Sequence, residues 1–157
     1  MRRAVTGAPD EVAGELVLAA SSVPGQHLLP HVLAAFRARF PLVRVRVAVS
    51  DTEAALRQVE QGRADLGLVG GAGGGPHLEF QRLTTDELVL VVPRQHPWWR
   101  KKHVSAADLI GQPLVQRESG SASRICFERS LERAGTATSA LNVVLEPPRR
   151  NRVQARH

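Results

Sequence analysis

Strand patterns alternate with helical patterns along most of this 157-residue chain. Residues 16–19 and 43–49 have the patterns of strands, and between them apolar residues recur at helical spacing over residues 29–40. The alternation continues with helical patterns at 52–61 and 121–134 and strand patterns at 66–69, 113–116 and 141–145. Because a strand–helix–strand unit returns the chain to a parallel position, the alternation predicts an α/β fold with a largely parallel sheet.

One apolar segment in the second half predicts a central strand. Residues 87–92, just before Pro93, consist of Glu87 followed by five apolar residues, without any alternation of polar and apolar positions. Strands of this kind are buried on both faces, as in the middle of a parallel sheet. We therefore expect residues 87–92 to form a buried strand.

Three helix ends can be predicted from capping signals. Thr52 is expected to cap the helix that follows it, and Gly62 to close that helix in the left-handed conformation. Ser105 and Asp108 have the spacing of a capping box with Asp in place of Glu, which predicts the start of a short helix.

Small hydroxyl residues stand at three of the predicted strand–helix junctions: Ser21 with Ser22, Thr52, and the segment 119–123. The first N–H groups of a helix have no partner within the helix, so they can hold a small anion. In parallel sheets, ligands bind beyond the carboxyl ends of the strands, where these junctions gather. Ser and Thr are also common N-caps, so each junction has a purely structural alternative. No catalytic base accompanies the hydroxyls, which favours binding of an acid over its conversion.

The net charge of +6 is unevenly distributed. Residues 147–157 carry +4 and residues 1–11 are neutral, which leaves +2 for residues 12–146. A basic tail contacts phosphates weakly and without sequence preference, so any nucleic-acid contact is expected from the tail alone. With four Phe, two Trp and no Tyr, aromatic platforms for single strands are scarce, and Trp98 and Trp99 are expected to pack on the surface.

Localisation is predicted to be cytoplasmic, without membrane contact. No apolar run reaches the ~18 residues of a membrane span, and no signal-peptide pattern follows Met1. Cys126 is the single cysteine, so the chain has no disulfide framework, and we expect neither a metal nor a cofactor.

Catalytic motifs do not match this sequence. No G-x-S-x-G elbow is present, and the glycine loop at 70–75 lacks the Lys-Ser/Thr of a phosphate loop. His27 and His31 are four residues apart, but Leu28 stands where the zinc pattern needs Glu. Glu118, near Arg117 and Arg124, is interpreted as part of a surface ion pair. We therefore expect a protein that is not an enzyme.

Several segments together resemble the effector-binding domain of LysR-type transcriptional regulators. They occur in the family's order and spacing from Gly14 to about Glu146, and include Ala-Ala-Ser-Ser-Val-Pro-Gly, Gly-Arg-Ala-Asp-Leu-Gly-Leu and His-Pro. The segments are residues 19–25, 28–30, 36–41, 51–53, 62–68, 86–93, 96–97 and 117–124. Within the family, the sequence is most similar to the branch of sulfur metabolism regulators.

The resemblance implies a two-lobed, periplasmic-binding-protein-like fold of type 2, with a small anionic metabolite held in a cleft between the lobes. Lobe I corresponds to residues 14–92 and a partial lobe II to residues 93–146. The implied effector-binding residues are Ser21, Ser22, Val23, Thr52, Ser119, Gly120, Ser121 and Ser123. A homodimer through lobe edges is a further implied partner, with residues 43–49 near such an edge.

Two departures from the family pattern lead to further expectations. Only a short segment, residues 1–13, precedes the domain, where the family has a winged helix-turn-helix and a linker helix; we expect it to be flexible and to read no DNA. Pro147 and Pro148 block a helix where the family continues, so residues 147–157 are expected to be a disordered basic tail after a frame change or premature end. A solute-binding protein of the periplasmic type, without a regulatory role, is the alternative function.

Overall fold

A computed structural model describes residues 11–71 and 77–148, which form two compact units. Of the described residues, 11–71 and 77–79 belong to the N-terminal unit and 80–148 to the C-terminal unit. The division after Glu79 differs from the lobe boundary expected after Val92, because residues 80–92 associate with the C-terminal unit. Outside the described residues lie residues 149–157 of the predicted basic tail, residues 1–10 of the N-terminal segment and residues 72–75 of the glycine loop. In residues 11–71 and 77–148, no helix has both the length and the apolar character needed to cross a membrane.

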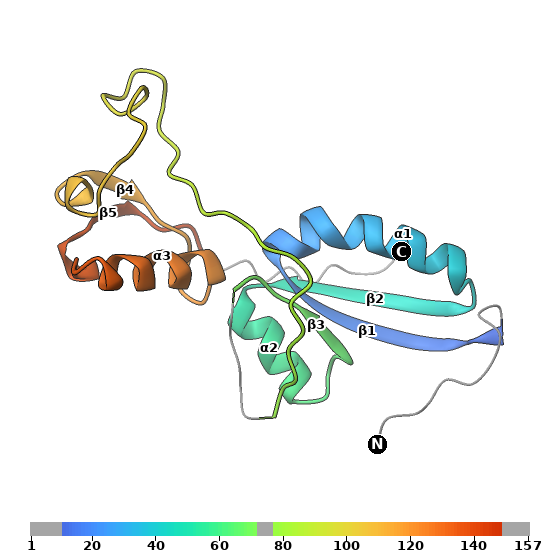
Figure 1. The fold of residues 1–157 in the computed structure, drawn as a ribbon. Coiled ribbons are helices and arrows are strands. Elements are labelled where there is room, and N and C mark those ends of the chain that lie inside the picture. Colours follow the sequence, from blue (N-terminus) through green and yellow to red (C-terminus); the bar gives the residue numbers. More distant parts are fainter. Residues whose placement is uncertain (1–10, 72–76, 149–157) are drawn as a thin grey trace. The chain divides into compact units, whose positions relative to one another are not determined.

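The N-terminal unit contains a three-stranded parallel sheet in the order β2-β1-β3 (Figure 1). Its strands are β1 (Gly14–Ser21), β2 (Val43–Ser50) and β3 (Leu66–Leu68), and the register runs from Gly14 opposite Val43 to Ser21 opposite Ser50. Helix α1 (Leu29–Arg39) connects β1 to β2, and α2 (Thr52–Glu60) connects β2 to β3. The predicted parallel α/β arrangement is therefore confirmed, and β2 is an edge strand.

The core of this unit lies on both faces of β1. Leu18 and Ala20 pack against Leu29 of α1, whereas Ala19, which points to the other face, packs against Ala55 of α2. Alternate residues of a strand point to opposite faces, so a helix on each face buries the second half of β1, from Leu18 to Ser21. The covered central strand thus fixes the position of its carboxyl end, where Ser21 lies.

A wide helical turn follows β1 and accommodates a proline. The π-helical turn η2 (Pro24–Leu28) leads directly into α1, whose second residue is Pro30. Proline has no N–H for a regular helical bond, and a π turn changes the bonding pattern just before it. The helical segment therefore starts immediately after Ser21, several residues earlier than the helix predicted at 29–40.

The C-terminal unit has a two-stranded parallel sheet of β4 (Pro113–Val115) and β5 (Asn142–Leu145). Helix α3 (Ala122–Arg133) and the 3₁₀ turn η4 (Thr138–Ala140) connect these strands. Gly135, one residue beyond the helix C-cap, has φ of +75°, the left-handed conformation common for a glycine after a helix. Gly62, for which this conformation is predicted after α2, has φ of +66°.

The predicted capping box opens the 3₁₀ turn η3 (Ala107–Leu109). The Ser105 backbone N–H and hydroxyl each donate to Asp108 Oδ2 at 2.8 Å, and the Asp108 N–H donates to Ser105 Oγ at 3.2 Å. These bonds, first that from the Ser105 backbone, hold the pKa of Asp108 below its ordinary value.

This lowered pKa predicts a pH-dependent effect of replacing Ser105 by alanine. The native carboxyl has a lower pKa than the unfolded one, so its stabilising contribution is present above the unfolded pKa and is lost as pH falls through the native pKa. Ser105→Ala is expected to lower Tm at pH 7 and to have a smaller effect at a pH below the native pKa of Asp108, where the carboxyl is protonated in both proteins. Thermal melts at both pH values measure this; an effect that does not change with pH would contradict it.

The prediction of a strand at residues 87–92 is wrong. These residues have no regular secondary structure, and Val91 is 83% exposed. A strand exists through hydrogen bonds to a neighbouring strand. No strand of the described residues pairs with this segment, so its apolar side chains are left partly exposed.

Candidate functional site

The carboxyl ends of the three strands of the N-terminal unit are joined by serine hydroxyls. Ser21, the last residue of β1, is buried, and its Oγ accepts a hydrogen bond from the Gly70 N–H at 3.1 Å. The Ser22 hydroxyl donates to the Ser50 carbonyl oxygen at 3.4 Å. The bond to Gly70 uses a lone pair of Ser21 Oγ and leaves the hydroxyl hydrogen able to donate to a ligand.

Asp51, and not Thr52, caps helix α2. Asp51 has an extended backbone (φ −74°, ψ 169°), and its Oδ1 accepts from the Ala54 N–H at 2.8 Å. Aspartate is at least as good an N-cap as threonine, and it comes first along the chain, so the predicted Thr52 cap is wrong. Thr52 is the first residue of the helix instead.

The hydroxyl of Thr52 differs from its neighbours because it makes no hydrogen bond within the described residues. The residue as a whole is only 5% exposed. Because every fully buried side-chain polar atom among the described residues has a partner, the Thr52 hydroxyl must reach solvent. A mostly buried residue, two positions after the end of β2, thus has a polar atom that water or a ligand can reach.

Val23 adds apolar surface to this strand end. It follows the two serines in the chain, lies in the first helical turn, and is 41% exposed. The structure therefore places four of the predicted residues, Ser21, Ser22, Val23 and Thr52, at one end of the N-terminal unit.

The other four predicted residues lie close together in the C-terminal unit: Ser119, Gly120 and Ser121 precede α3, and Ser123 is in its first turn. Gly120 has φ of +86°, which favours glycine, and the Ser121 and Ser123 hydroxyls are 3.0 Å apart. The Ser119 N–H donates to Glu146 Oε1 at 3.0 Å. A carboxylate of the chain itself therefore lies where a helix N-terminus favours negative charge.

Arg124 holds that carboxylate in place. Its Nη1 lies 2.7 Å from Glu146 Oε2 and its Nε lies 2.8 Å from Glu128 Oε1, while Nη1 also donates to the Arg117 carbonyl oxygen at 3.2 Å. The hydrogen bond to Glu128, and then that to Glu146, raises the pKa of Arg124 above its ordinary value.

The interpretation of Glu118 as part of a surface ion pair is corrected. Glu118 is 3% exposed and accepts two hydrogen bonds from the Arg117 guanidinium, at 2.8 and 2.7 Å. This side-chain hydrogen bond raises the pKa of Arg117 above its ordinary value.

Arg124 pairs with Glu128 and Glu146, as described above. The Arg124–Glu128 pair has the i, i+4 helical spacing and could have been predicted from the sequence, whereas Glu146 carried no local signal.

Residues 9–147 match the family described as the LysR substrate binding domain, and the chain belongs to this family. The HTH-type transcriptional regulator CysL of Bacillus subtilis is 34% identical over 124 residues, which are 79% of this chain and 42% of the regulator. The phosphonates import ATP-binding protein PhnC of Anaeromyxobacter dehalogenans is 38% identical over 136 residues, which are 85% of this chain and 26% of that protein. The chain thus spans less than half the length of these relatives.

Solved structures confirm the predicted fold class. The C-terminal domain of a probable LysR family transcriptional regulator from Rhodococcus sp. RHA1 is 28% identical, with a TM-score of 0.72 over 86% of this chain and 64% of that one. The effector binding domain of QuiR in complex with shikimate has a TM-score of 0.76 at 17% identity, over 87% of this chain and 65% of that one. The fold is the α/β, periplasmic-binding-protein-like type 2 fold of LysR effector-binding domains.

Proposed function

We propose that this chain is the sensing part of a LysR-type regulator and that it binds a small anionic metabolite through Ser21, Ser22, Val23 and Thr52. The observation that carries the proposal is the Thr52 hydroxyl, which reaches solvent at the end of a sheet but has no partner within the described residues. A hydroxyl in the first turn of α2 lies beside helical N–H groups, and both donate to a carboxylate or sulfate oxygen.

The turn at Ser119, Gly120, Ser121 and Ser123 is proposed as a second anion-binding element, within its own unit. Its support is that a carboxylate, that of Glu146, already accepts the Ser119 N–H there. Shikimate, which the QuiR domain binds, is itself a carboxylic acid.

The proposal assigns binding without a chemical step. The Ser21 and Ser22 hydroxyls have backbone groups as their partners, so neither is activated by a base in the part of the chain that the structure describes. His27 and His31 are exposed, and within residues 11–71 and 77–148 no cluster of His, Cys, Asp and Glu could hold a metal.

The regulatory role is proposed from family membership. An effector controls a regulator only if it binds one of two states more tightly than the other. We further propose that β2, which pairs only with β1 among the described strands, contributes to a homodimer. In the regulatory relatives, we propose that DNA is contacted by the part of the protein outside the region that matches this chain.

Thermal unfolding with a panel of acids tests the proposed site. A ligand at 100 times its Kd stabilises the native state by about 2.7 kcal/mol, so Tm rises by several degrees with the right member of a panel containing sulfate, sulfite, acetylserine and dicarboxylates. Thr52→Val keeps the shape of the side chain and removes the hydroxyl; it is expected to weaken binding about tenfold, because a hydrogen bond to a charged ligand is lost. Thr84→Val, at an exposed threonine of the other unit, is the matched control. Equal binding by both variants would contradict the proposal.

A further inference from the structure

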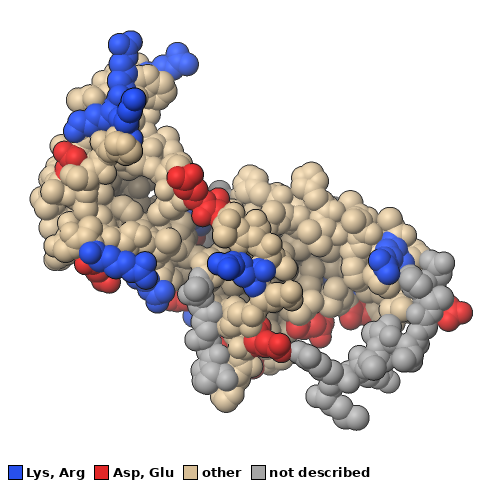
Figure 2. All heavy atoms as spheres, viewed as in Figure 1, with Lys and Arg blue, Asp and Glu red and all other residues tan. Residues whose placement is uncertain are grey.

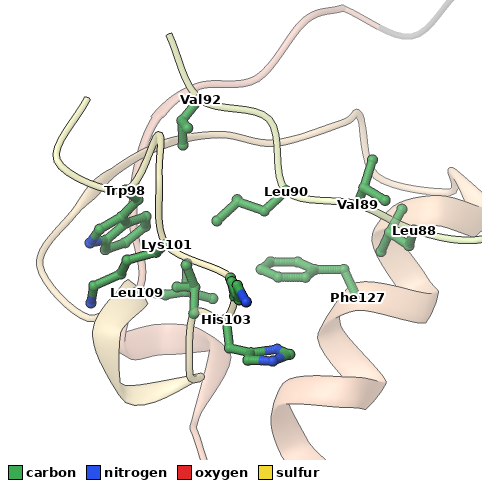
Figure 3. A pocket seen from close by; sticks show the side chains of 11 residues that line it. Leu88, Val89, Leu90, Val92, Trp98, Lys101, His103, Leu109 and Phe127 are labelled. Carbon is green, nitrogen blue, oxygen red and sulfur yellow. The ribbon is translucent and has the colours of Figure 1, made fainter. Parts of the chain in front are cut away.

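A cavity of about 450 Å³ lies within the C-terminal unit, separate from all eight proposed effector-binding residues. Figure 3 shows side chains from three parts of this unit around one space: the 88–92 segment, the loop that contains Trp98, and Phe127 of α3. Small-molecule sites in proteins have volumes of ~300–1,000 Å³ and mostly apolar linings. The cavity has the size and the position to hold a small organic molecule.

Most of the lining is apolar. It includes Leu88, Val89, Leu90, Leu109 and Phe127, and Leu90 is 45% exposed. Apolar surface that is removed from water when a ligand binds contributes to the binding free energy in proportion to its area. The residues left exposed by the absence of a strand at 87–92 thus form a wall that favours an apolar ligand body.

The polar part of the lining contains two cations, Lys101 and Lys102. His103 also contributes to it, and the lining contains no Asp or Glu. Figure 2 shows Lys and Arg side chains gathered over the loop that holds these residues. Lys101 already lies 3.5 Å from Asp108 and 5.8 Å from the centre of the Trp98 ring, whereas Lys102 has no ion-pair partner among the described residues. Lys102 is therefore the lysine of the lining that is available to pair with an anionic ligand.

We propose that this cavity binds an amphipathic organic anion, namely a carboxylate with an apolar body of about six to eight carbons. The apolar wall holds the body, and Lys102 at the cationic part of the lining pairs with the carboxylate. The ligand class differs from that of the proposed effector site, because a small polar acid such as acetate has nothing to bury against Phe127 and Leu90.

The two tryptophans provide a matched pair of reporters. Trp98 lines the cavity, Trp99 is half-exposed and does not, and the chain has no other tryptophan. In the full chain, octanoate is expected to shift the emission of Trp99→Phe, which retains Trp98, and to leave that of Trp98→Phe unchanged. Hexanoate is expected to bind about tenfold more weakly, since it lacks two methylene groups.

Charge substitutions test the role of Lys102. Lys102→Gln is expected to weaken octanoate binding about threefold and to leave octanol binding unchanged, and Arg100→Gln, at a neighbouring cation outside the lining, is expected to change neither. The proposal would be overturned if both tryptophan variants responded equally to octanoate, or if octanoate and acetate bound with equal affinity. Equal effects of the two charge substitutions on octanoate binding would also overturn it. Trp98 emission that depends on protein concentration and ignores octanoate would assign the cavity to a second copy of the chain and would also overturn it.

Discussion

Replacement of Leu29 by alanine is expected to lower the free energy of unfolding of the N-terminal unit by about 3 kcal/mol. Leu29 is 2% exposed and packs against Leu18 and Ala20 of the central strand. Truncation removes three carbons from this contact, and the two strand residues are held by the ladder of β1, so the space cannot close fully. Chemical denaturation followed by circular dichroism measures the loss.

Val32→Ala on the same helix is the matched control. Val32 is more than half exposed, so its truncation is expected to cost less than about 0.5 kcal/mol. If the two variants lost the same stability, the assignment of the core to the α1 face of β1 would be contradicted.

Replacement of Arg124 by alanine is expected to lower the stability of the C-terminal unit by about 2 kcal/mol. Arg124 binds Glu128, Glu146 and the Arg117 carbonyl oxygen, and its side chain is mostly buried. Without the guanidinium, Glu128 and Glu146 lose the cation that they share and repel one another, although each keeps a neutral hydrogen-bond donor, Gln116 Nε2 for Glu128 and the Ser119 N–H for Glu146. The three groups are partly accessible to water, so the loss is smaller than for a fully buried pair.

Arg129→Ala is the control for this prediction, because Arg129 is an exposed arginine of the same helix without an ion pair among the described residues. Urea denaturation of both variants, with unfolding of the C-terminal unit followed through the tryptophans that lie in it, compares them. A loss below about 0.5 kcal/mol for Arg124→Ala would show that its ion pairs are no stronger than exposed surface pairs.

The sequence predicted the regular elements well where local and long-range signals agree. The strands and helices that alternate from β1 to β3, the Ser105–Asp108 capping box and the left-handed Gly62 follow from periodicity and capping chemistry alone. Residues 87–92 show the limit of this reasoning, because an apolar run specifies a preference for burial but not the strand that must pair with it.

The site was predictable in its chain positions but less so in its bonding. The positions of Ser21, Ser22 and Thr52 at strand ends follow from topology. Asp51 caps α2 in place of the predicted Thr52. Asp and Thr both favour the N-cap position, so the sequence alone does not show which of two adjacent residues caps the helix. The Glu146 carboxylate at Ser119 comes from 27 residues away, which no local pattern encodes.

The measurement that most directly tests the central claim is a ¹H–¹⁵N correlation spectrum of the full chain, titrated with the acid that raises Tm most. The account predicts that the amide resonances of Ser22, Val23 and Thr52 move in proportion to occupancy, and that these shifts weaken in Thr52→Val. Shifts confined to residues around the Phe127 cavity, with Ser22 and Thr52 unmoved, would contradict the assignment of the small-anion site to the end of the β2-β1-β3 sheet.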